Sequence, residues 1–346
     1  MRKTVFFLLV SFIIGCVGKT KTVDEKAQGK ETVSNLLPTD SHETVNGIVF
    51  FSFDNGLTWE DKSKGLPDTV SLGLGGIAAS DKMLGIAAKE AGIYLFDDAK
   101  ENWTPIPTDS KIIDSNLGTL AFFKDQIFLG TQHNGVYSTS DLGKTWINIT
   151  EGLKSMTIRK LIPVGDKLYV GTDAGFYSYN ETPNSWEPEL VNNTLQVNGI
   201  TGLNGNIYIG TNQGVFRSPA GKKEWAKVLD KSSVHNINAE NNTIFAMTYN
   251  ELLSSTNGGQ TWQNIQKGLP AQLYTFNIIS NGNTLFAGQW DGVYRKENPN
   301  ENWKTSSNGL PTKLAITNMK TYKGAIVVTG NERKLKKGMS TRKDAF

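Results

Sequence analysis

Short apolar runs recur along most of the chain, and residues that favour turns separate them. In one example the runs are Met156 to Pro163, Lys167 to Gly171 and Gly175 to Tyr179, and Ser185-Trp186 opens a fourth. Short runs rich in β-branched and aromatic residues predict strands. The turn between the second and third runs is tight and contains Gly, as a hairpin with positive φ requires. Each group of four runs therefore predicts a meander of antiparallel strands, the unit of a propeller blade.

Seven of the eight tryptophans recur at nearly constant spacing. They are Trp59, Trp103, Trp146, Trp186, Trp225, Trp262 and Trp303, with gaps of 44, 43, 40, 39, 37 and 41 residues. A period near 40 means that each repeat is one supersecondary unit, which must stack on its neighbours to bury its apolar faces. A Gly-Leu pair six residues after four of them (Gly65, Gly152, Gly268, Gly309) predicts the crossing into the next blade.

The ends of the repeat array decide the number of blades. Six complete units lie between the first and last of these tryptophans, and two half-units flank them. The first half supplies strands at Gly47 to Phe53 and Leu57 to Asp61, and the second supplies Leu314 to Met319 and Ala325 to Thr329. Joining the halves leaves no free sheet edge in the ring. We therefore predict an all-β, seven-bladed β-propeller over 45–330, with four-stranded antiparallel blades and a last blade closed by both termini.

The segments outside the repeats predict an anchored protein. Residues 1–15 have a basic start and an apolar stretch, and Ile13-Ile14-Gly15-Cys16 fits a bacterial lipobox, which predicts a signal peptide and lipidation of Cys16. The alternative is a plain secretory leader with an accidental cysteine. Residues 16–44 are polar and predict a flexible linker, and 331–346 form a basic tail. Val17, in place of Asp, favours an outer-membrane lipoprotein of the bacterial envelope.

Composition limits the chemistry. The chain is 38% hydrophobic and 20% charged, and its net charge of +3 comes from the leader and the tail. The body has no excess of basic residues, so we expect no nucleic-acid partner. The single cysteine excludes a disulfide within one chain, and the three histidines share no spacing that would hold a metal. We expect a monomer without a cofactor.

One motif returns in three repeats: Ser52-Phe53-Asp54-Asn55-Gly56-Leu57-Thr58-Trp59, Thr139-Ser140-Asp141-Leu142-Gly143-Lys144-Thr145-Trp146 and Ser255-Thr256-Asn257-Gly258-Gly259-Gln260-Thr261-Trp262. It resembles the Asp-box, or bacterial neuraminidase repeat, of propellers that include sialidases, sortilin-type receptors and photosystem II assembly-factor-like proteins. In that family the box lies on the hairpin between the third and fourth strands, away from the usual ligand face. We expect the carboxylate to bind its own hairpin's N–H groups and the Trp to pack between sheets.

The resemblance to sialidases implies three arginines around a substrate carboxylate. Of the six arginines, Arg2, Arg333 and Arg342 lie in the leader or tail, and Arg217 and Arg295 lie on third strands, so only Arg159 is expected near the axis. A triad is therefore not expected, and no carboxylate pair for another glycosidase lies on the first strands. Glycan-directed hydrolysis remains the alternative to binding without turnover.

The innermost strands share an apolar, polar or small, polar or small, apolar pattern, with Ile278 as the exception. Around an axis this pattern predicts a polar ring. Crowding beside a wet channel would explain small polar residues, but it does not call for Arg and Lys. Candidate ligand-binding residues in four adjacent blades are Arg159, Lys160, Asn198, His235, Asn236 and Asn277.

Trp290 and Asp291 occupy a turn between second and third strands, at the level where the first strands begin. Trp290 is the one tryptophan outside the repeat. We expect it either to anchor a ligand or to fold down on a neighbouring blade. The sequence as a whole favours a non-catalytic, lipid-anchored binding or assembly module, whose partner is an envelope protein or a glycan.

Overall fold

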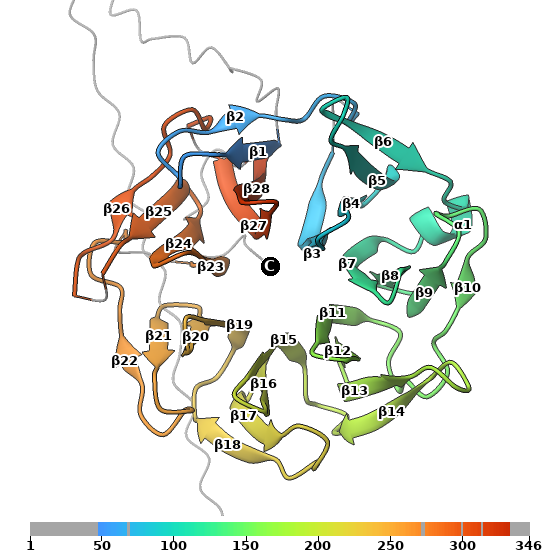
Figure 1. The fold of residues 1–346 in the computed structure, drawn as a ribbon. Coiled ribbons are helices and arrows are strands. Elements are labelled where there is room, and N and C mark those ends of the chain that lie inside the picture. The colour runs from blue at the N-terminus through green and yellow to red at the C-terminus, as the bar shows by residue number, and fades with distance from the viewer. Residues whose placement is uncertain (1–47, 68–69, 271–273, 299, 313, 333–346) are drawn as a thin grey trace, which may run out of the picture. The chain divides into compact units, whose positions relative to one another are not determined.

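The computed structural model describes residues 48–67, 70–270, 274–298, 300–312 and 314–332. These residues form seven four-stranded antiparallel sheets arranged as the blades of a ring around one axis (Figure 1). The first strand of each blade lies nearest the axis and the fourth lies on the rim. The predicted all-β, seven-bladed architecture is confirmed.

Each blade contributes one strand to each of four concentric layers. The first strands are β3 (Leu72–Ala79), β7 (Leu117–Phe123), β11 (Ile158–Val164), β15 (Val197–Leu203), β19 (Val234–Glu240), β23 (Asn277–Asn281) and β27 (Leu314–Tyr322). The second strands are β4 (Leu84–Ala88), β8 (Gln126–Thr131), β12 (Lys167–Thr172), β16 (Asn206–Thr211), β20 (Thr243–Thr248), β24 (Thr284–Gln289) and β28 (Ala325–Glu332). The third strands are β5 (Gly92–Asp97), β9 (Val136–Thr139), β13 (Gly175–Asn180), β17 (Gly214–Pro219), β21 (Leu252–Ser255), β25 (Gly292–Lys296) and β1 (Val49–Ser52). The outer strands are β6 (Asn102–Ile106), β10 (Ile147–Asn148), β14 (Ser185–Leu190), β18 (Ala226–Leu229), β22 (Gln263–Asn264), β26 (Lys304–Thr305) and β2 (Glu60–Asp61).

One helical turn, α1 (Ser110–Ile113), was not predicted from the sequence. It lies between β6 and β7, and the Asp109 side chain caps it by accepting a hydrogen bond from the Lys111 N–H. The turn lengthens one blade crossing and does not enter the ring of sheets.

The closing blade has the strand order β2-β1-β28-β27, so both ends of the chain build it as predicted. Val49 pairs with Thr329 and Ser52 pairs with Ile326, which joins the N-terminal and C-terminal halves by backbone hydrogen bonds. Strand β28 extends to Glu332, two residues beyond the predicted propeller end at Gly330, because pairing with β27 needs backbone groups and not apolar side chains.

Both faces of the closing blade are buried, because side chains alternate along a strand. Val49 and Phe51 of β1 pack with Leu72 and Trp103 of the first complete blade. Phe50, between them in sequence, packs on the other side in a cluster that includes Phe286 of the blade before. The blades thus bury their apolar faces only against each other, as the repeat period predicts.

The seven repeat tryptophans also link each blade to the one before it. Each indole Nε1 donates a hydrogen bond of 2.6–3.0 Å to a backbone carbonyl at or just past that blade's outer strand. The acceptors, in order, are Ser306, Lys62, Pro107, Ile149, Glu189, Val228 and Ile265. The ring is closed by the same bond as every other interface, since Trp59 of the closing blade donates to Ser306 of the last complete blade.

The repeated motif holds its own hairpin, between the third and fourth strands. The Asp54 carboxylate accepts hydrogen bonds from the Thr58 N–H at 2.9 Å, the Thr58 hydroxyl at 2.5 Å and the Ser52 hydroxyl at 2.8 Å. The Ser52 oxygen in turn accepts from the Gly56 N–H at 2.7 Å. These bonds favour the ionised carboxylate, and the Thr58 hydroxyl leads in lowering the pKa of Asp54 to about 2.

The two other motifs repeat this arrangement. In the second, the Thr145 hydroxyl likewise leads in lowering the pKa of Asp141 to about 2. In the third, Asn257 replaces the acid and its amide donates to the Thr261 hydroxyl, which reverses that one bond and keeps the turn. A folding role for the motif accounts for all of these contacts.

Candidate functional site

A β-bulge near the start of the inner strands explains why two successive positions are polar. In β11 the register with β12 shifts between Ile158 and Lys160, and equivalent shifts occur in β7, β15, β19 and β27. A bulge places two residues of one strand opposite a single residue of the partner strand. It therefore redirects a side chain that regular alternation would point to the other face of the sheet. The bulge thus brings polar residues to the channel from adjacent positions, of which Arg159 and Lys160 are one pair.

The apparent exception at Ile278 is a register error in the sequence alignment. Asn277 pairs with Gly288, just as Lys160 pairs with Gly171. Asn277 is therefore the equivalent of Lys160, and Phe276 takes the position of Arg159. Ile278 is a fully buried apolar residue of the kind found at the next position in the other blades. The pairing of backbones sets the register here, and the side-chain pattern alone allowed two alignments.

Arg159 is held by its neighbours. Its Nε forms an ion pair with Asp173, at the turn between β12 and β13, and its Nη1 donates to the Asn198 Oδ1 at 3.0 Å. The sequence analysis missed Asp173, although its place in a turn at the level of the strand starts could have suggested it. Arg159 and Asn198 are brought together as predicted, but the guanidinium already has an anionic partner within its own blade.

The predicted asparagines connect adjacent inner strands. Asn198 donates from Nδ2 to the Val234 carbonyl at 3.1 Å, and Asn236 donates to the Phe276 carbonyl at 2.9 Å. Asn277 reaches the Met319 carbonyl at 3.5 Å. Each amide therefore bridges to the next blade, which favours a structural role and agrees with the crowding interpretation for these three positions. Their use by a ligand stays a prediction.

His235 is also engaged. Its Nε2 lies 2.8 Å from the Thr275 carbonyl, which places the proton on Nε2 and leaves Nδ1 as an acceptor. Nδ1 is buried without a hydrogen-bond partner among the described residues. Burial lowers the pKa of His235 to about 4, so the ring is neutral at pH 7. The imidazole stacks on Tyr274 with ring centroids 4.0 Å apart.

That stack is part of an aromatic cluster, which joins two blades at the face where the inner strands begin. Tyr274 also contacts Tyr249 edge-on at 6.0 Å and Trp290 at 6.0 Å, and Phe276 contacts Trp290 at 4.7 Å. We call His235, Tyr249, Tyr274, Phe276 and Trp290 the mouth cluster. The sequence predicted Trp290 and His235 as site residues but not the tyrosines, because Tyr274 precedes the first strand of its blade and Tyr249 lies in a turn of the blade before.

The Trp290 side chain is half-buried, so it is neither fully exposed to solvent nor part of the buried core. It contacts Phe276 of its own blade. The neighbouring Asp291 is exposed, and its Oδ2 accepts a hydrogen bond from the Tyr294 hydroxyl at 3.0 Å, which contributes to raising the pKa of Tyr294 to about 12 after the larger effect of burial.

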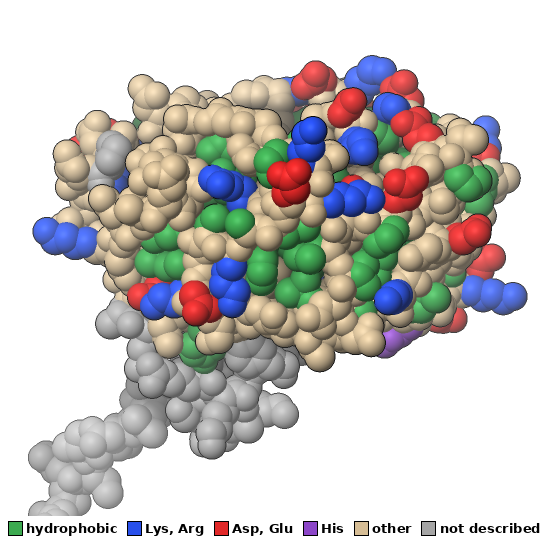
Figure 2. All heavy atoms as spheres, turned by 90° about the horizontal axis from the view of Figure 1, so that it is seen from below, with side chains coloured by type: hydrophobic (Ala, Val, Ile, Leu, Met, Phe, Trp, Pro, Cys, Tyr) green, Lys and Arg blue, Asp and Glu red, His purple; other side chains and the backbone are tan. Residues whose placement is uncertain are grey.

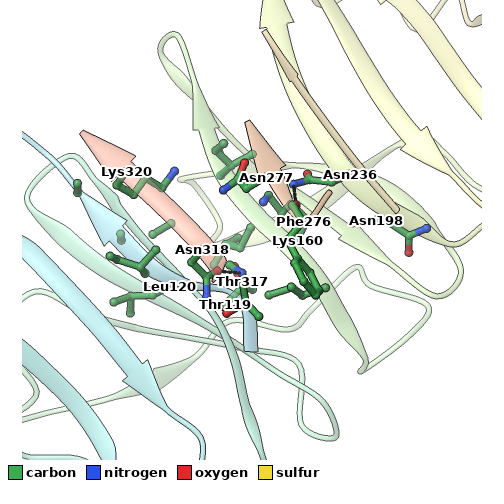
Figure 3. Close-up of a pocket in the computed structure, with 18 of the residues that line it drawn as sticks. Thr119, Leu120, Lys160, Asn198, Asn236, Phe276, Asn277, Thr317, Asn318 and Lys320 are labelled. Carbon is green, nitrogen blue, oxygen red and sulfur yellow. Dashed lines mark hydrogen bonds between the residues drawn. The ribbon is translucent and has the colours of Figure 1, made fainter. Parts of the chain in front are cut away.

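Below the strand starts the channel contains a cavity of about 220 Å³. Lys160 of β11 and Lys320 of β27 line it, together with Thr119, Asn236 and Asn277 (Figure 3). The Lys160 side chain is half-exposed to the channel, yet protein surrounds the channel on all sides. This enclosure, with a smaller contribution from the charge of Lys320, lowers the pKa of Lys160 to about 8.

The rim has a different character. Basic and acidic side chains are interspersed over the side of the ring shown in Figure 2. Exposed ion pairs also join adjacent blades, such as Lys82 with Asp125 between the turns that connect first and second strands. Arg217 and Arg295 lie on third strands, where each donates to the backbone of the next blade's motif hairpin, at Gly258 and Asn55. Neither arginine reaches the channel.

Within the described ranges, no group of three His, Cys, Asp or Glu side chains is placed to hold a metal ion. The same part of the chain contains no helix that is both long and apolar enough to cross a membrane. Cys16, the predicted lipidation site, lies outside the described residues.

Fold and channel together define a closed seven-bladed propeller with Asp-box-like hairpins and a polar, aromatic-rimmed axial mouth. The model of the family described as photosynthesis system II assembly factor YCF48 matches residues 43–295. The chain belongs to this family.

Relatives with curated names agree. The chain is 26% identical over 171 residues to the photosystem II assembly lipoprotein Ycf48 of Synechococcus sp. (strain CC9902), which covers 47% of this chain and 50% of that protein. It is 25% identical over 245 residues to the photosystem II assembly protein Ycf48 of Thermosynechococcus vestitus, covering 66% of this chain and 70% of the relative. The match thus spans half of the first relative's length.

A solved structure described as YCF48 bound to D1 peptide superimposes with a TM-score of 0.59, covering 78% of this chain and all of that one. Its sequence is 10% identical, so this likeness supports the fold alone.

Proposed function

We propose that this protein is a non-catalytic assembly factor that binds a protein partner at the mouth of its channel. Membership of a family whose named relatives are assembly proteins carries the proposal. The relative whose structure is described as bound to a peptide adds support for a protein ligand. As the partner of this chain itself, we expect a segment of an envelope protein.

The mouth cluster suits that role chemically. Aromatic side chains supply a large contact area at low entropic cost, and a half-buried tryptophan is the residue type most often found at the centre of an interface. Tyr274 and Trp290 lie in contact at the channel mouth, with the exposed Asp291 beside them. Arg159 and Lys160 would add donors for carbonyl or carboxylate groups of the partner.

The same site has little that would serve a hydrolase. His235 is kept neutral by burial, and the Asp173 carboxylate is ion-paired with Arg159. A general acid or nucleophile needs a pKa and an exposure matched to its task. Binding without turnover therefore follows from the geometry better than glycan hydrolysis does.

We further infer that the protein acts at a membrane surface of the bacterial envelope through a lipid on Cys16. The lipobox carries this inference, and one relative is named a lipoprotein. The comparison with photosystem assembly proteins does not support placement in the outer membrane, and that placement is inferred from Val17 alone.

Site-specific crosslinking tests the proposal. Asp291 is exposed beside Trp290, so a photoreactive benzoylphenylalanine at this position should capture a discrete protein adduct when cells are irradiated. Ile147, on the outer strand β10 and 57% exposed, is the matched control on the rim. Adding Trp290→Ala to the Asp291 crosslinker should abolish the adduct. Equal adducts from both positions, or an adduct that survives Trp290→Ala, would contradict binding at the mouth.

A further inference from the structure

Two lysine ammonium groups enter the channel cavity without an acidic partner there. Lys160 and Lys320 both line it, and among the described residues neither forms a hydrogen bond or an ion pair. Their charges repel each other, which contributes to the lowered pKa of Lys160. Because the pKa of Lys160 remains about 8, most molecules still carry this charge at pH 7.

A buried hydroxyl in the same place also lacks a partner. Thr119 is 1% exposed and lines the cavity, and its Oγ1 has no hydrogen-bond partner among the described residues. A buried hydroxyl left unpaired costs about 1–3 kcal/mol. Natural proteins retain few such groups.

The backbone of Gly75 covers this hydroxyl. A Cβ placed on Gly75 would lie only 3.0 Å from the Thr119 Oγ1 and 4.0 Å from the Lys160 Cδ, so Gly75 packs closely against the hydroxyl and beside the aliphatic part of Lys160. Gly75 has φ +88°, and its N–H is fixed by the Asn318 Oδ1 at 2.6 Å. The Thr119 hydroxyl is therefore closed off, and a ligand in the cavity would meet the lysines.

Like charges enclosed in one cavity require an explanation, because an unpaired buried ion is costly unless a counter-charge is present. Burial lowers the pKa of Lys320, and Glu240 at the end of β19, two blades away around the ring, opposes this electrostatically without forming an ion pair. The Glu240 carboxylate instead accepts hydrogen bonds from Ser280 and Asn238. His235, at the mouth end, is neutral and adds no positive charge.

We propose that the channel binds a small oxyanion of the size of phosphate, held by the Lys160 and Lys320 ammonium groups. Both are donors, and ammonium–oxyanion hydrogen bonds are among the strongest that proteins make. The cavity of about 220 Å³ has room for the anion and several waters. His235 and Phe276 of the mouth cluster also line this cavity, but the binding of phosphate alone does not rest on the proposed function.

Equilibrium dialysis of the full-length protein against labelled phosphate tests the site. At pH 7 in a low-chloride buffer, wild type should bind one phosphate per chain. Lys160→Met and Lys320→Met should each weaken it by about tenfold or more, because each removes a charge-assisted bond. Lys144→Met is the matched control, since Lys144 is an exposed lysine on a motif hairpin, and it should bind phosphate as wild type does.

Competition by sulfate and by acetate distinguishes a tetrahedral oxyanion from a carboxylate. Displacement of phosphate by sulfate at similar concentration supports the site as described, and acetate should compete more weakly. Circular dichroism checks that each variant is folded, and the two lysine variants act independently, so one that misfolds leaves the other. Absence of stoichiometric phosphate binding by wild type, or equal binding by the Lys144 and Lys160 variants, overturns the proposal, whatever the outcome of the crosslinking at the mouth.

Discussion

The strongest test of the fold is to remove the C-terminal half of the closing blade. A chain that ends at Lys313 lacks β27 and β28, so β1 loses its partner β28, and the β1–β2 pair is left without the rest of its sheet. Six aliphatic side chains on the deleted strands have no exposed surface: Leu314, Ile316, Met319, Ile326, Val327 and Val328.

Their loss exceeds what a domain can tolerate. At about 1.5–3 kcal/mol for each fully buried side chain, the six contribute roughly 9–18 kcal/mol. The whole stability of a folded domain is about 5–15 kcal/mol. The truncated chain should therefore unfold, and it should not behave as a slightly smaller propeller.

Tryptophan fluorescence and thermal melting measure this directly, because the repeat tryptophans lie between blades. The truncated chain should lack a cooperative transition, and a synthetic peptide of residues 314–332 added in trans should restore it. Deleting only 333–346, which the sequence places outside the propeller, is the control and should leave the transition unchanged. A wild-type melting curve for the shorter chain would refute the reasoning about closure.

Three further outcomes are expected. The folded pKa values of Asp54 and Asp141 are about 2, against an ordinary 3.8, so the stability that these carboxylates contribute is present above pH 4 and is lost as pH falls from about 4 to 2. The free energies of urea unfolding of wild type and of the Asp54→Asn/Asp141→Asn double variant should therefore converge at low pH. Parallel curves would contradict this. The pKa of Lys160 is about 8 in the folded state and near 10.5 in the unfolded state, so the folded state binds fewer protons between these pH values. The free energy of unfolding should therefore rise between pH 8 and 10.5 in phosphate-free buffer, and Lys160→Met should lack this rise. A rise of equal size in that variant would assign the effect to other groups. Cys16→Ala should release the protein from the membrane fraction, as followed by fractionation and lipid labelling, and an unlabelled variant that stays in the membrane would argue against the lipobox.

Local patterns carried the prediction of the fold. The short apolar runs, the tight Gly turns and the Trp positions are local features of each repeat, and they recur from one repeat to the next. The half-repeats at the two ends had no other partner, so the closing blade also followed from counting. Helix α1 was missed because four residues are too few for a periodic pattern to be visible.

The site depended on contacts between different strands and turns, from 14 positions apart for Arg159 with Asp173 to 40 for Asn236 with Phe276. Whether Arg159 is free or paired was decided by Asp173 and Asn198, and whether the asparagines face a ligand or the next strand was decided by backbone carbonyls of the adjacent blade. The register of β23 was decided by its pairing with β24, which moved Phe276 to the mouth.

The sequence by itself determined the repeat unit, the number of blades and the way the ring closes, because each of these is written as a period along the chain. Only the tertiary structure decided which polar groups are already satisfied and which are left over. Hydrogen bonds and charges across blades depend on register and bulges, and these arise when separate strands are brought side by side. For that reason the channel with Lys160, Lys320 and Thr119 became visible only in the assembled ring.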